Sequence, residues 1–355
     1  MHRPVMSLLV ALSLAFAAVP SHADPGAANK PDWREALRQR VERIDESSPG
    51  RLGVYVKRLD TNEVYSHHAD EGWYLGSTVK VAIAIAALRQ VDAGKLKLQS
   101  TAQLQEGDKI DGPGELVWAK AGTRYTIDSL LTRMIGVSDN TAANLLVRTV
   151  GQDNLDKAAS DMMGDGVKKI TDLAQVRYEV YSEIHPDARK LTRLQLVEIA
   201  GVPQGPQRFN AVRRALDLPV DQLKVKTMEE AYDRYYGKQL NTATLDGYGR
   251  MLEKLVRGQA LSAQSTQQLF KYMKFGRRGD YRLEGGIPKS EMIIHKTGTQ
   301  YRRACHMAVI NPQDGGAKGI VVTTCAADMD DQKEAGGIFR EVGRAVSETA
   351  LKSMK

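Results

Sequence analysis

The pattern of hydrophobic and polar positions predicts a short helix followed by a hairpin near the start of the chain. Hydrophobic residues recur on one helical face of residues 31–44, at Trp33, Leu37, Val41 and Ile44. Residues 51–59 alternate between hydrophobic and polar side chains, which is the period of a half-buried strand. The polar residues 60–63 indicate a turn, and we expect a return strand to begin at Val64.

The middle of the chain is predicted to be helical. The run from Ser77 to Val91 is apolar on nearly every face, which indicates a helix that is buried on all sides. Gly94 follows it where a C-terminal cap is expected. Helical periodicity continues over 126–135 and 141–150, and no strong strand pattern interrupts this part of the chain.

In the last quarter of the chain the pattern changes to strands. Three short β-like runs are separated by turn residues, at 292–298, 305–310 and 319–324. An amphipathic helix closes the chain, with Phe339, Val342 and Val346 on one face.

Because strands come from both ends of the chain, the economical fold combines an α/β part with an all-α part. We expect one antiparallel sheet built from both termini with flanking helices, in residues 24–76 and 241–355. Residues 77–240 are expected to form an inserted all-helical lobe.

The first 23 residues have the pattern of an export signal. Arg3 supplies a positive start, Met6 to Val19 is almost uninterruptedly apolar, and Ser21-His-Ala23 offers small residues for cleavage. The apolar run is short for a helix that spans a bilayer, so an uncleaved membrane anchor is only the alternative. We therefore expect an exported protein, periplasmic or secreted, that keeps no membrane span after cleavage near Asp24.

Charge and cysteine content narrow the classes of partner. The formal net charge is +7, but the basic residues are spread along the chain and form no aromatic-interleaved stripe, which argues against nucleic acid. The sequence shows no obvious dimer helix, so we expect a monomer.

The two cysteines, Cys305 and Cys325, lie in no Cys-x-x-Cys motif and have no histidine cluster beside them, so neither a metal site nor another cofactor is expected. A cross-strand disulfide and two buried free thiols both remain open for this pair.

Three short motifs occur once each and in a fixed order. They are Ser77-Thr-Val-Lys80 at the start of the buried helix, Ser138-Asp-Asn140 before a helix, and Lys296-Thr-Gly298 at the end of an apolar strand. Each motif alone has an ordinary structural explanation: a surface serine with a solvated lysine, a helix N-cap, or a lysine at a strand end. The ordered set, with each member in a fitting context, instead predicts one catalytic cleft.

The first motif has a clear chemical reason. A serine and a lysine three residues apart lie on the same face of a helix. Ser77 would lie at the positive end of the helix dipole, where developing negative charge is favoured. Burial disfavours the charged form of Lys80, which can then accept the serine proton. This motif therefore predicts a serine nucleophile with a lysine base.

Together the motifs resemble those of serine β-lactamases and penicillin-binding proteins, and the flanking residues are closest to class A β-lactamases. The runs Ser138-Asp-Asn-Thr-Ala-Ala-Asn-Leu-Leu146 and His295-Lys-Thr-Gly-Thr299 carry this resemblance, which covers about residues 33–351. It implies that Ser77 attacks a lactam carbonyl with help from Lys80, and that Ser138 relays a proton to the leaving nitrogen.

The resemblance also implies a set of substrate-binding groups. Asn140 would hydrogen-bond the acylamide side chain, and the Lys296-Thr297-Gly298 motif would hold the substrate carboxylate. The backbone N–H groups of Ser77 and Thr299 would form the oxyanion hole. Asp139 would buttress its loop.

The chain departs from class A enzymes near the glutamate that activates the hydrolytic water. Arg177-Tyr-Glu179 resembles the start of that loop and makes Glu179 the candidate base, with a solvated loop carboxylate as the alternative. Glu183 stands where the family has an asparagine, and a second carboxylate there is expected to raise the pKa of Glu179.

A second departure is an insertion of about 57 residues, 184–240, which class A enzymes span with far less chain. We expect extra helices in it, one with Phe209, Val212 and Leu216 on one face and one capped by Thr227-x-x-Glu230.

Beyond the Lys296 strand, Arg302 and Arg303 are candidates for assisting carboxylate binding. Trp118 is expected in the core, with a cleft wall as its alternative.

Three functions follow, in order of preference. The first is a class A-like β-lactamase that hydrolyses the lactam amide through a Ser77 acyl-enzyme. The second is a D-alanyl-D-alanine peptidase or related cell-wall serine hydrolase that is acylated by lactams but releases them slowly. The third is a non-catalytic receptor for peptidoglycan or an inhibitor. The expected ligand is a small β-lactam or a peptidoglycan stem peptide.

Overall fold

A computed structural model describes residues 32–274, 282–331 and 333–354 of the protein. The predicted export signal, residues 1–23, lies outside these described residues. The described residues from Trp33 onward belong to one compact unit. Within the described ranges, every helix is too short or too polar to cross a membrane.

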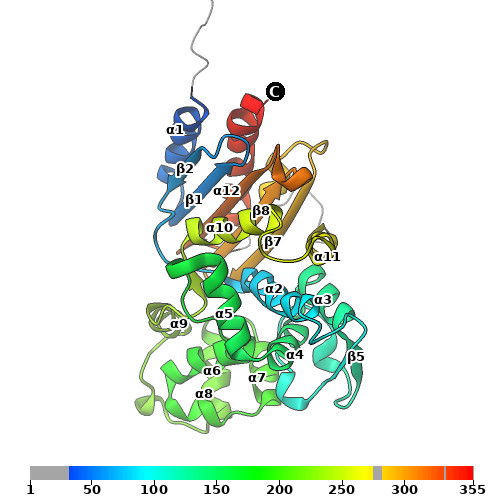
Figure 1. Ribbon diagram of the computed structural model, residues 1–355. Helices are drawn as coiled ribbons and strands as arrows, with labels where there is room; N and C mark the ends of the chain where they lie inside the picture. The colour runs from blue at the N-terminus through cyan, green and yellow to red at the C-terminus, as the bar shows by residue number, and fades with distance from the viewer. Residues whose placement is uncertain (1–31, 275–281, 332, 355) are drawn as a thin grey trace, which may run out of the picture. The chain divides into compact units, whose positions relative to one another are not determined.

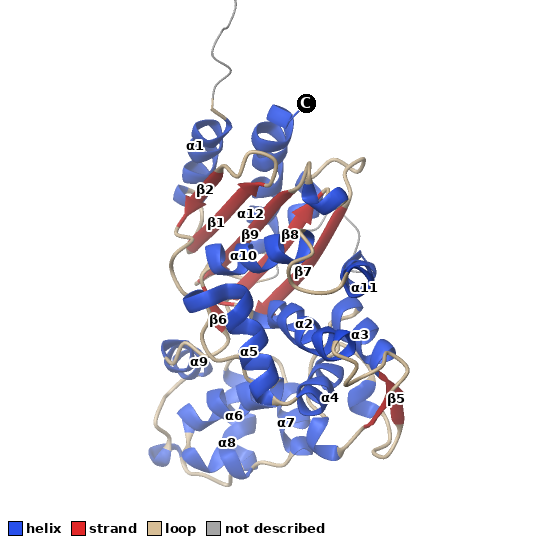
Figure 2. Cartoon of the chain, viewed as in Figure 1, coloured by secondary structure: helices blue, strands red, loops and turns tan. Residues whose placement is uncertain are grey.

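Five strands form one antiparallel sheet in the order β2-β1-β9-β8-β7 (Figures 1 and 2). Their bounds are β1 (Arg51–Arg58), β2 (Val64–His67), β7 (Ile293–Gln300), β8 (Arg303–Ile310) and β9 (Ile320–Ala327). Strand β1 pairs with β9 along its whole length, from Arg51 opposite Ala327 to Arg58 opposite Ile320. The prediction that both ends of the chain build one sheet is confirmed.

Helices cover both faces of this sheet. Val54 and Val56 of β1 pack with α1 (Trp33–Glu46) and α12 (Glu334–Val346) in one hydrophobic cluster, whereas Tyr55 packs in the cluster of α2 and α10 (Leu245–Val256). Successive side chains of a strand point to opposite faces, so β1 serves both clusters. Figure 2 shows α10 in front of the strands and α12 behind them.

The chain between the sheet halves is mainly helical, as expected. Its helices are α2 (Val79–Asp92), α3 (Ile127–Gly136), α4 (Asn140–Val150), α5 (Gln152–Met163), α6 (Leu173–Ile184), α7 (Arg193–Ala200), α8 (Pro206–Ala215) and α9 (Met228–Gly237), and α11 (Ala263–Lys274) follows α10. The expectation of an all-helical lobe over 77–240 is wrong in one respect, because β4 (Thr101–Gln103) and β5 (Arg124–Thr126) pair within it. Three-residue strands are too short to give a period-two pattern.

The chain passes twice between the five-stranded sheet and the mainly helical part, and a second small sheet joins these two passages. Strand β3 (Trp73–Tyr74) pairs with β6 (Thr242–Ala243), directly before the Ser77 turn and directly after the insertion. The two passages are therefore hydrogen-bonded to each other.

The insertion forms α7, α8 and α9 and has its own hydrophobic cluster. Phe209 and Val212 of α8 and Tyr232 and Tyr235 of α9 pack there with α6. The predicted capping box of α9 is confirmed in part: the Thr227 hydroxyl accepts a hydrogen bond from the Glu230 backbone N–H, but the Glu230 carboxylate accepts from the Lys226 backbone N–H instead of that of Thr227. Helix α7 was not predicted, although Thr192 and Gln195 form a capping box at its start.

Candidate active site

The Ser77 turn lies directly against strand β7. Residues Gly76–Thr78 form a short 3-10 turn that leads into α2, and Gly76 has φ +52°, a conformation that glycine adopts without strain. A Cβ on Gly298 would lie 2.1 Å from the Leu75 carbonyl oxygen, and one on Gly76 would lie 2.8 Å from the Thr299 nitrogen. Glycine at both positions therefore lets the two backbones meet, which brings the Ser77 and Thr299 N–H groups to one place.

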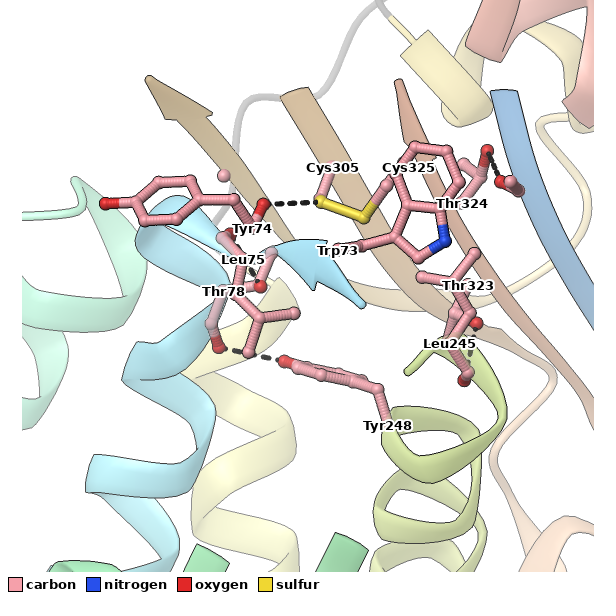
Figure 3. The surroundings of a disulfide bond; sticks show 12 residues. Trp73, Tyr74, Leu75, Thr78, Leu245, Tyr248, Cys305, Thr323, Thr324 and Cys325 are labelled. Carbon is pink, nitrogen blue, oxygen red and sulfur yellow. Dashed lines mark hydrogen bonds between the residues drawn. A yellow bond between two sulfur atoms is a disulfide. The ribbon is translucent and has the colours of Figure 1, made fainter. Parts of the chain in front are cut away.

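The same turn is hydrogen-bonded to α10, and a disulfide lies beside the strand that precedes it. The Tyr248 hydroxyl donates to the Thr78 carbonyl at 2.9 Å (Figure 3). Cys305 and Cys325 are directly opposite on β8 and β9 and form a disulfide, which decides between the two alternatives for this pair. The Cys305 sulfur lies 3.3 Å from the carbonyl oxygen of Tyr74, in the strand that leads to the turn. The Tyr248 hydrogen bond thus fixes the turn that carries the candidate nucleophile, and the disulfide lies against the strand that leads to it.

Lys80 is fully buried beside Ser77. Its Nζ atom lies 3.1 Å from the Oγ atoms of both Ser77 and Ser138, 2.5 Å from the Ser138 carbonyl oxygen and 2.7 Å from the Asn140 Oδ1. Burial, followed by the charge of Lys296, lowers the Lys80 pKa well below its usual value, and Asp139 only partly opposes this. A neutral amine has two N–H donors and one lone pair. The two shortest contacts are to oxygens that only accept, so they use both donors and leave the lone pair to the serine hydroxyls.

Lys296 faces the same group from the sheet side. Its Nζ donates to Ser138 Oγ at 3.0 Å and to the Thr297 carbonyl at 3.0 Å. Burial and the charge of Arg282 lower the Lys296 pKa to about 7. Ser138 has φ +62°, a left-handed conformation that is uncommon outside glycine. Its hydroxyl thus lies between two lysines, one from each side of the cleft.

Asp139 and Asn140 fix the second motif at the start of α4. The Asp139 carboxylate accepts from the backbone N–H groups of Ala142 at 2.8 Å and Leu116 at 3.2 Å, so its expected structural role is confirmed. The Asn140 amide accepts from Lys80 and donates to the Asp111 carbonyl at 2.7 Å. An amide NH₂ carries two donors, so the second can serve a ligand.

The loop under Asn140 was missed in the sequence. Asp111 accepts two hydrogen bonds from Arg177, at 2.7 and 2.9 Å, and both side chains are largely buried. A Cβ on Gly112 would lie 2.1 Å from the Asn140 amide nitrogen. The signal available in the sequence was Gly112-Pro-Gly114, two glycines that flank a proline before the Ser138 loop.

The arginine beside the candidate carboxylate site is also one that the sequence analysis missed. Buried Arg282 donates to Thr299 Oγ1 at 2.8 Å and to the carbonyls of Gly298 and Cys305 at 3.0 and 2.9 Å. Arg302 instead pairs with Glu229, and Arg303 pairs with Asp328 and stacks over Tyr236. The guanidinium that contacts the Lys296 strand at Thr299 is therefore that of Arg282.

Glu179 lies on α6 and is held by cations from the insertion. Its carboxylate accepts from Gln175, Arg189 and Lys238, each at 2.7 Å, and Lys238 also pairs with Glu183. Burial opposes ionisation of Glu179, but the hydrogen bonds from Lys238 and Arg189 outweigh it and lower the pKa. The expectation that Glu183 raises the Glu179 pKa is wrong, because Lys238 lies between the two carboxylates. The hydrogen bonds of Lys80 to other described residues do not include Glu179.

Trp118 was expected in the core, and this expectation is wrong. Its side chain is 75% exposed, at the end of the short turn Leu116–Trp118. Only the neighbours Leu116 and Val117 are buried there.

Fold and motif geometry together define a serine acyl-transfer enzyme class, and the comparison with family models gives the family. The model for the beta-lactamase enzyme family matches residues 36–350, so the chain belongs to this family. A β-lactamase of Rhodobacter capsulatus is 24% identical over 313 residues, which cover 88% of this chain and 87% of that protein. The β-lactamase OXY-2 of Klebsiella oxytoca is 24% identical over 345 residues, 95% and 97% of the two chains.

Solved structures show the same fold. A β-lactamase from Xanthomonas campestris aligns with a TM-score of 0.66 at 21% identity, covering 90% of this chain and 99% of that one. PBP-A aligns with a TM-score of 0.66 at 18% identity, covering 89% and 96%. A variant of PBP-A, captured as an acyl-enzyme complex with penicillin G, aligns with a TM-score of 0.65 at 18% identity, covering 90% and 97%.

Proposed function

We propose that this protein is a serine β-lactamase of the class A type, which opens β-lactams through an acyl-enzyme at Ser77. One observation carries the proposal: Lys80 Nζ lies 3.1 Å from both Ser77 Oγ and Ser138 Oγ, and Lys296 Nζ lies 3.0 Å from Ser138 Oγ. This chain of groups joins a nucleophile, a base and a proton donor in one cleft.

In the acylation step, neutral Lys80 takes the Ser77 proton as Oγ attacks the lactam carbonyl carbon. The N–H groups of Ser77 and Thr299 stabilise the oxyanion; removing one such donor from a serine protease costs about 2.7–4 kcal/mol. Ser138 gives its proton to the leaving lactam nitrogen and regains one from the lysines. The C–N bond breaks, and an ester to Ser77 remains.

Substrate recognition is assigned to the groups around β7. Cationic Lys296 attracts the substrate carboxylate, with Thr297, Gly298 and Thr299 lining the strand beside it. Arg282 adds a second positive charge, because its guanidinium already contacts the Thr299 hydroxyl at 2.8 Å. Asn140 supplies an amide N–H to the acylamide side chain.

Release of the acyl group allows a second candidate function. The Glu179 carboxylate is bound by Arg189, Lys238 and Gln175, and its lowered pKa makes it a weak proton acceptor. This observation favours a cell-wall peptidase that is acylated by lactams and releases them slowly. In the lactamase account, Glu179 activates the hydrolytic water.

A chromogenic cephalosporin followed by intact-mass measurement over time separates these functions. Rapid turnover supports the lactamase, a persistent one-to-one adduct supports the slow peptidase, and no adduct would contradict both. In the lactamase, Glu179→Gln should trap the acyl-enzyme. A deacylation rate unchanged by Glu179→Gln would assign water activation to another group. Glu198→Gln, a change in α7, is the matched control.

We also propose that the protein acts outside the cytoplasm. The Cys305–Cys325 disulfide supports this, because disulfides persist mainly in oxidising compartments. The positive and apolar start of the sequence supports it as well. Fractionation of the native host should recover the protein in the periplasm or medium, and recovery from the cytosol would contradict the proposal.

A further inference from the structure

Helix α1 lies beside strand β2 (Figure 1). Three side chains of types that can ligate a metal come together at this place. Asp45 is near the end of α1, His67 is the last residue of β2, and His68 follows it. Asp45 Oδ2 lies 2.8 Å from His67 Nε2 and 3.9 Å from His68 Nε2. Candidate ligand atoms of the three residues all lie within 4.8 Å of one another.

Two adjacent histidines on a strand would normally point to opposite faces. His67 shares the face of Tyr65, which packs in the same cluster as α1, so its ring faces Asp45. His68 has φ +48°, a left-handed conformation that ends the strand. The two ring centroids are consequently only 4.4 Å apart. An uncommon backbone conformation thus brings both imidazoles to one carboxylate.

The surrounding contacts orient these groups as in a metal site. Asp45 Oδ1 accepts from the Leu52 backbone N–H at 3.2 Å, which directs Oδ2 toward the histidines. Glu71 Oε1 lies 2.9 Å from His68 Nδ1, and a carboxylate only accepts, so Nδ1 carries the proton and Nε2 has a lone pair. A carboxylate bound to the second nitrogen of a histidine is the usual partner of a metal-ligating histidine.

From this geometry we infer a binding site for a divalent transition-metal ion of the Zn²⁺ type, with Asp45 Oδ2, His67 Nε2 and His68 Nε2 as ligands. Tetrahedral Zn²⁺ with bonds of about 2.0–2.1 Å places its ligand atoms about 3.4 Å apart, between the two separations from Asp45 Oδ2. The His67 proton moves from Nε2 to Nδ1 on binding, so the ring keeps its charge. The Glu71 carboxylate that contacts His68 also forms an ion pair with Arg51, so this arginine lies at the margin of the inferred metal site.

The ion would clamp α1 to the end of β2. Strand β2 is one edge of the sheet and β7, which carries Lys296, is the other edge. The site is therefore separate from the candidate active site, and its effect should appear in the stability of the fold. A ligand that binds only the folded state raises the melting temperature.

The test uses the full chain, freed of metal with a chelator and titrated with ZnCl₂ by calorimetry. One Zn²⁺ per chain is expected, with a melting temperature several degrees higher when the site is full. His68→Ala should abolish this binding, and the exposed position of His68 lets the variant fold. Glu71→Gln, which removes the orienting carboxylate charge and its ion pair with Arg51, should weaken binding about 10–100-fold.

The matched control is His185→Ala, because His185 also lies near an aspartate but outside this cluster. It should keep full Zn²⁺ affinity. Co²⁺ should give visible absorption bands of a low-coordinate histidine site in the wild type and not in His68→Ala. The inference is overturned if wild type binds no Zn²⁺, or if His67→Ala and His68→Ala bind it as tightly as wild type does.

Discussion

Lys296 Nζ lies 3.0 Å from Ser138 Oγ, although the two residues belong to different parts of the fold. Lys296 is on edge strand β7, and Ser138 is in the turn between α3 and α4. This contact crosses the candidate cleft and completes the chain that begins at Ser77. In the proposed mechanism, the charge of Lys296 therefore bears on both proton transfer and substrate binding.

Acylation by an anionic lactam should fall as the pH rises through about 7. The Lys296 pKa is lowered to about 7 from its usual value, so its charge is present below that pH and lost above it. Loss of the charge removes the attraction for the substrate carboxylate. Stopped-flow acylation rates across neutral pH should show this alkaline limb, and Lys296→Arg should move it to higher pH. A rate that climbs steadily through the alkaline range in wild type would contradict this.

Removing the buried lysine should nearly stop acylation. Lys80→Met keeps an unbranched side chain of similar size but has no amine to accept a proton, so the acylation rate constant should drop by about 10²–10⁴-fold. Lys95→Met, at an exposed lysine just beyond α2, should leave that rate unchanged. Pre-steady-state kinetics with a chromogenic lactam measures both, and equal rates in the two variants would refute the role of Lys80.

The Asp111–Arg177 pair should matter for stability. Asp111→Ala leaves the largely buried Arg177 guanidinium without its carboxylate, so the free energy of unfolding should fall by about 3–5 kcal/mol. Urea unfolding followed by circular dichroism checks this. Arg234→Ala breaks the exposed pair with Glu230 and should cost less than about 1 kcal/mol. Similar losses in the two variants would argue that the Asp111 pair is solvated.

The disulfide should stabilise the sheet. Cys305 and Cys325 are separated by 20 residues, and closing a loop of that length stabilises a fold by about 3 kcal/mol through the unfolded state. The double variant Cys305→Ala/Cys325→Ala should show this loss in urea unfolding. Its midpoint should not respond to added reductant, whereas that of the wild type should decrease. An identical midpoint in both proteins would show that the crosslink adds nothing.

Much of the fold could be predicted because its long elements have strong periodicity. The strands that the two ends of the chain contribute to the sheet were predicted from the alternation of 51–59 and from the apolar runs of the last quarter. Short strands could not be predicted, because two or three residues are too few to show a periodic pattern of hydrophobic residues. Strands β3 to β6 were missed for that reason. Helix α7 was missed even though Thr192 and Gln195 mark its start.

Only those residues of the candidate site that belong to the three sequence motifs could be predicted to lie together. Ser77, Lys80, Ser138 and Lys296 meet as their spacing and order suggested. The cationic partners of Glu179, Arg189 and Lys238, were not foreseen, because they come from separate positions in the insertion and no local pattern links them. The Asp45–His67–His68 cluster was missed for a related reason. A strand pattern assigns neighbouring histidines to opposite faces, and only the left-handed His68 brings them together.

The central claim is that a lactam acylates Ser77, and peptide mapping of the adduct tests it most directly. The protein is quenched soon after mixing with penicillin G, digested with trypsin and analysed by tandem mass spectrometry. The added mass should appear on the peptide 59–80, with fragment ions that assign it to Ser77 and exclude Ser66. It should be absent from Ser77→Ala. Added mass on any other residue, or an adduct that survives in Ser77→Ala, would contradict the account.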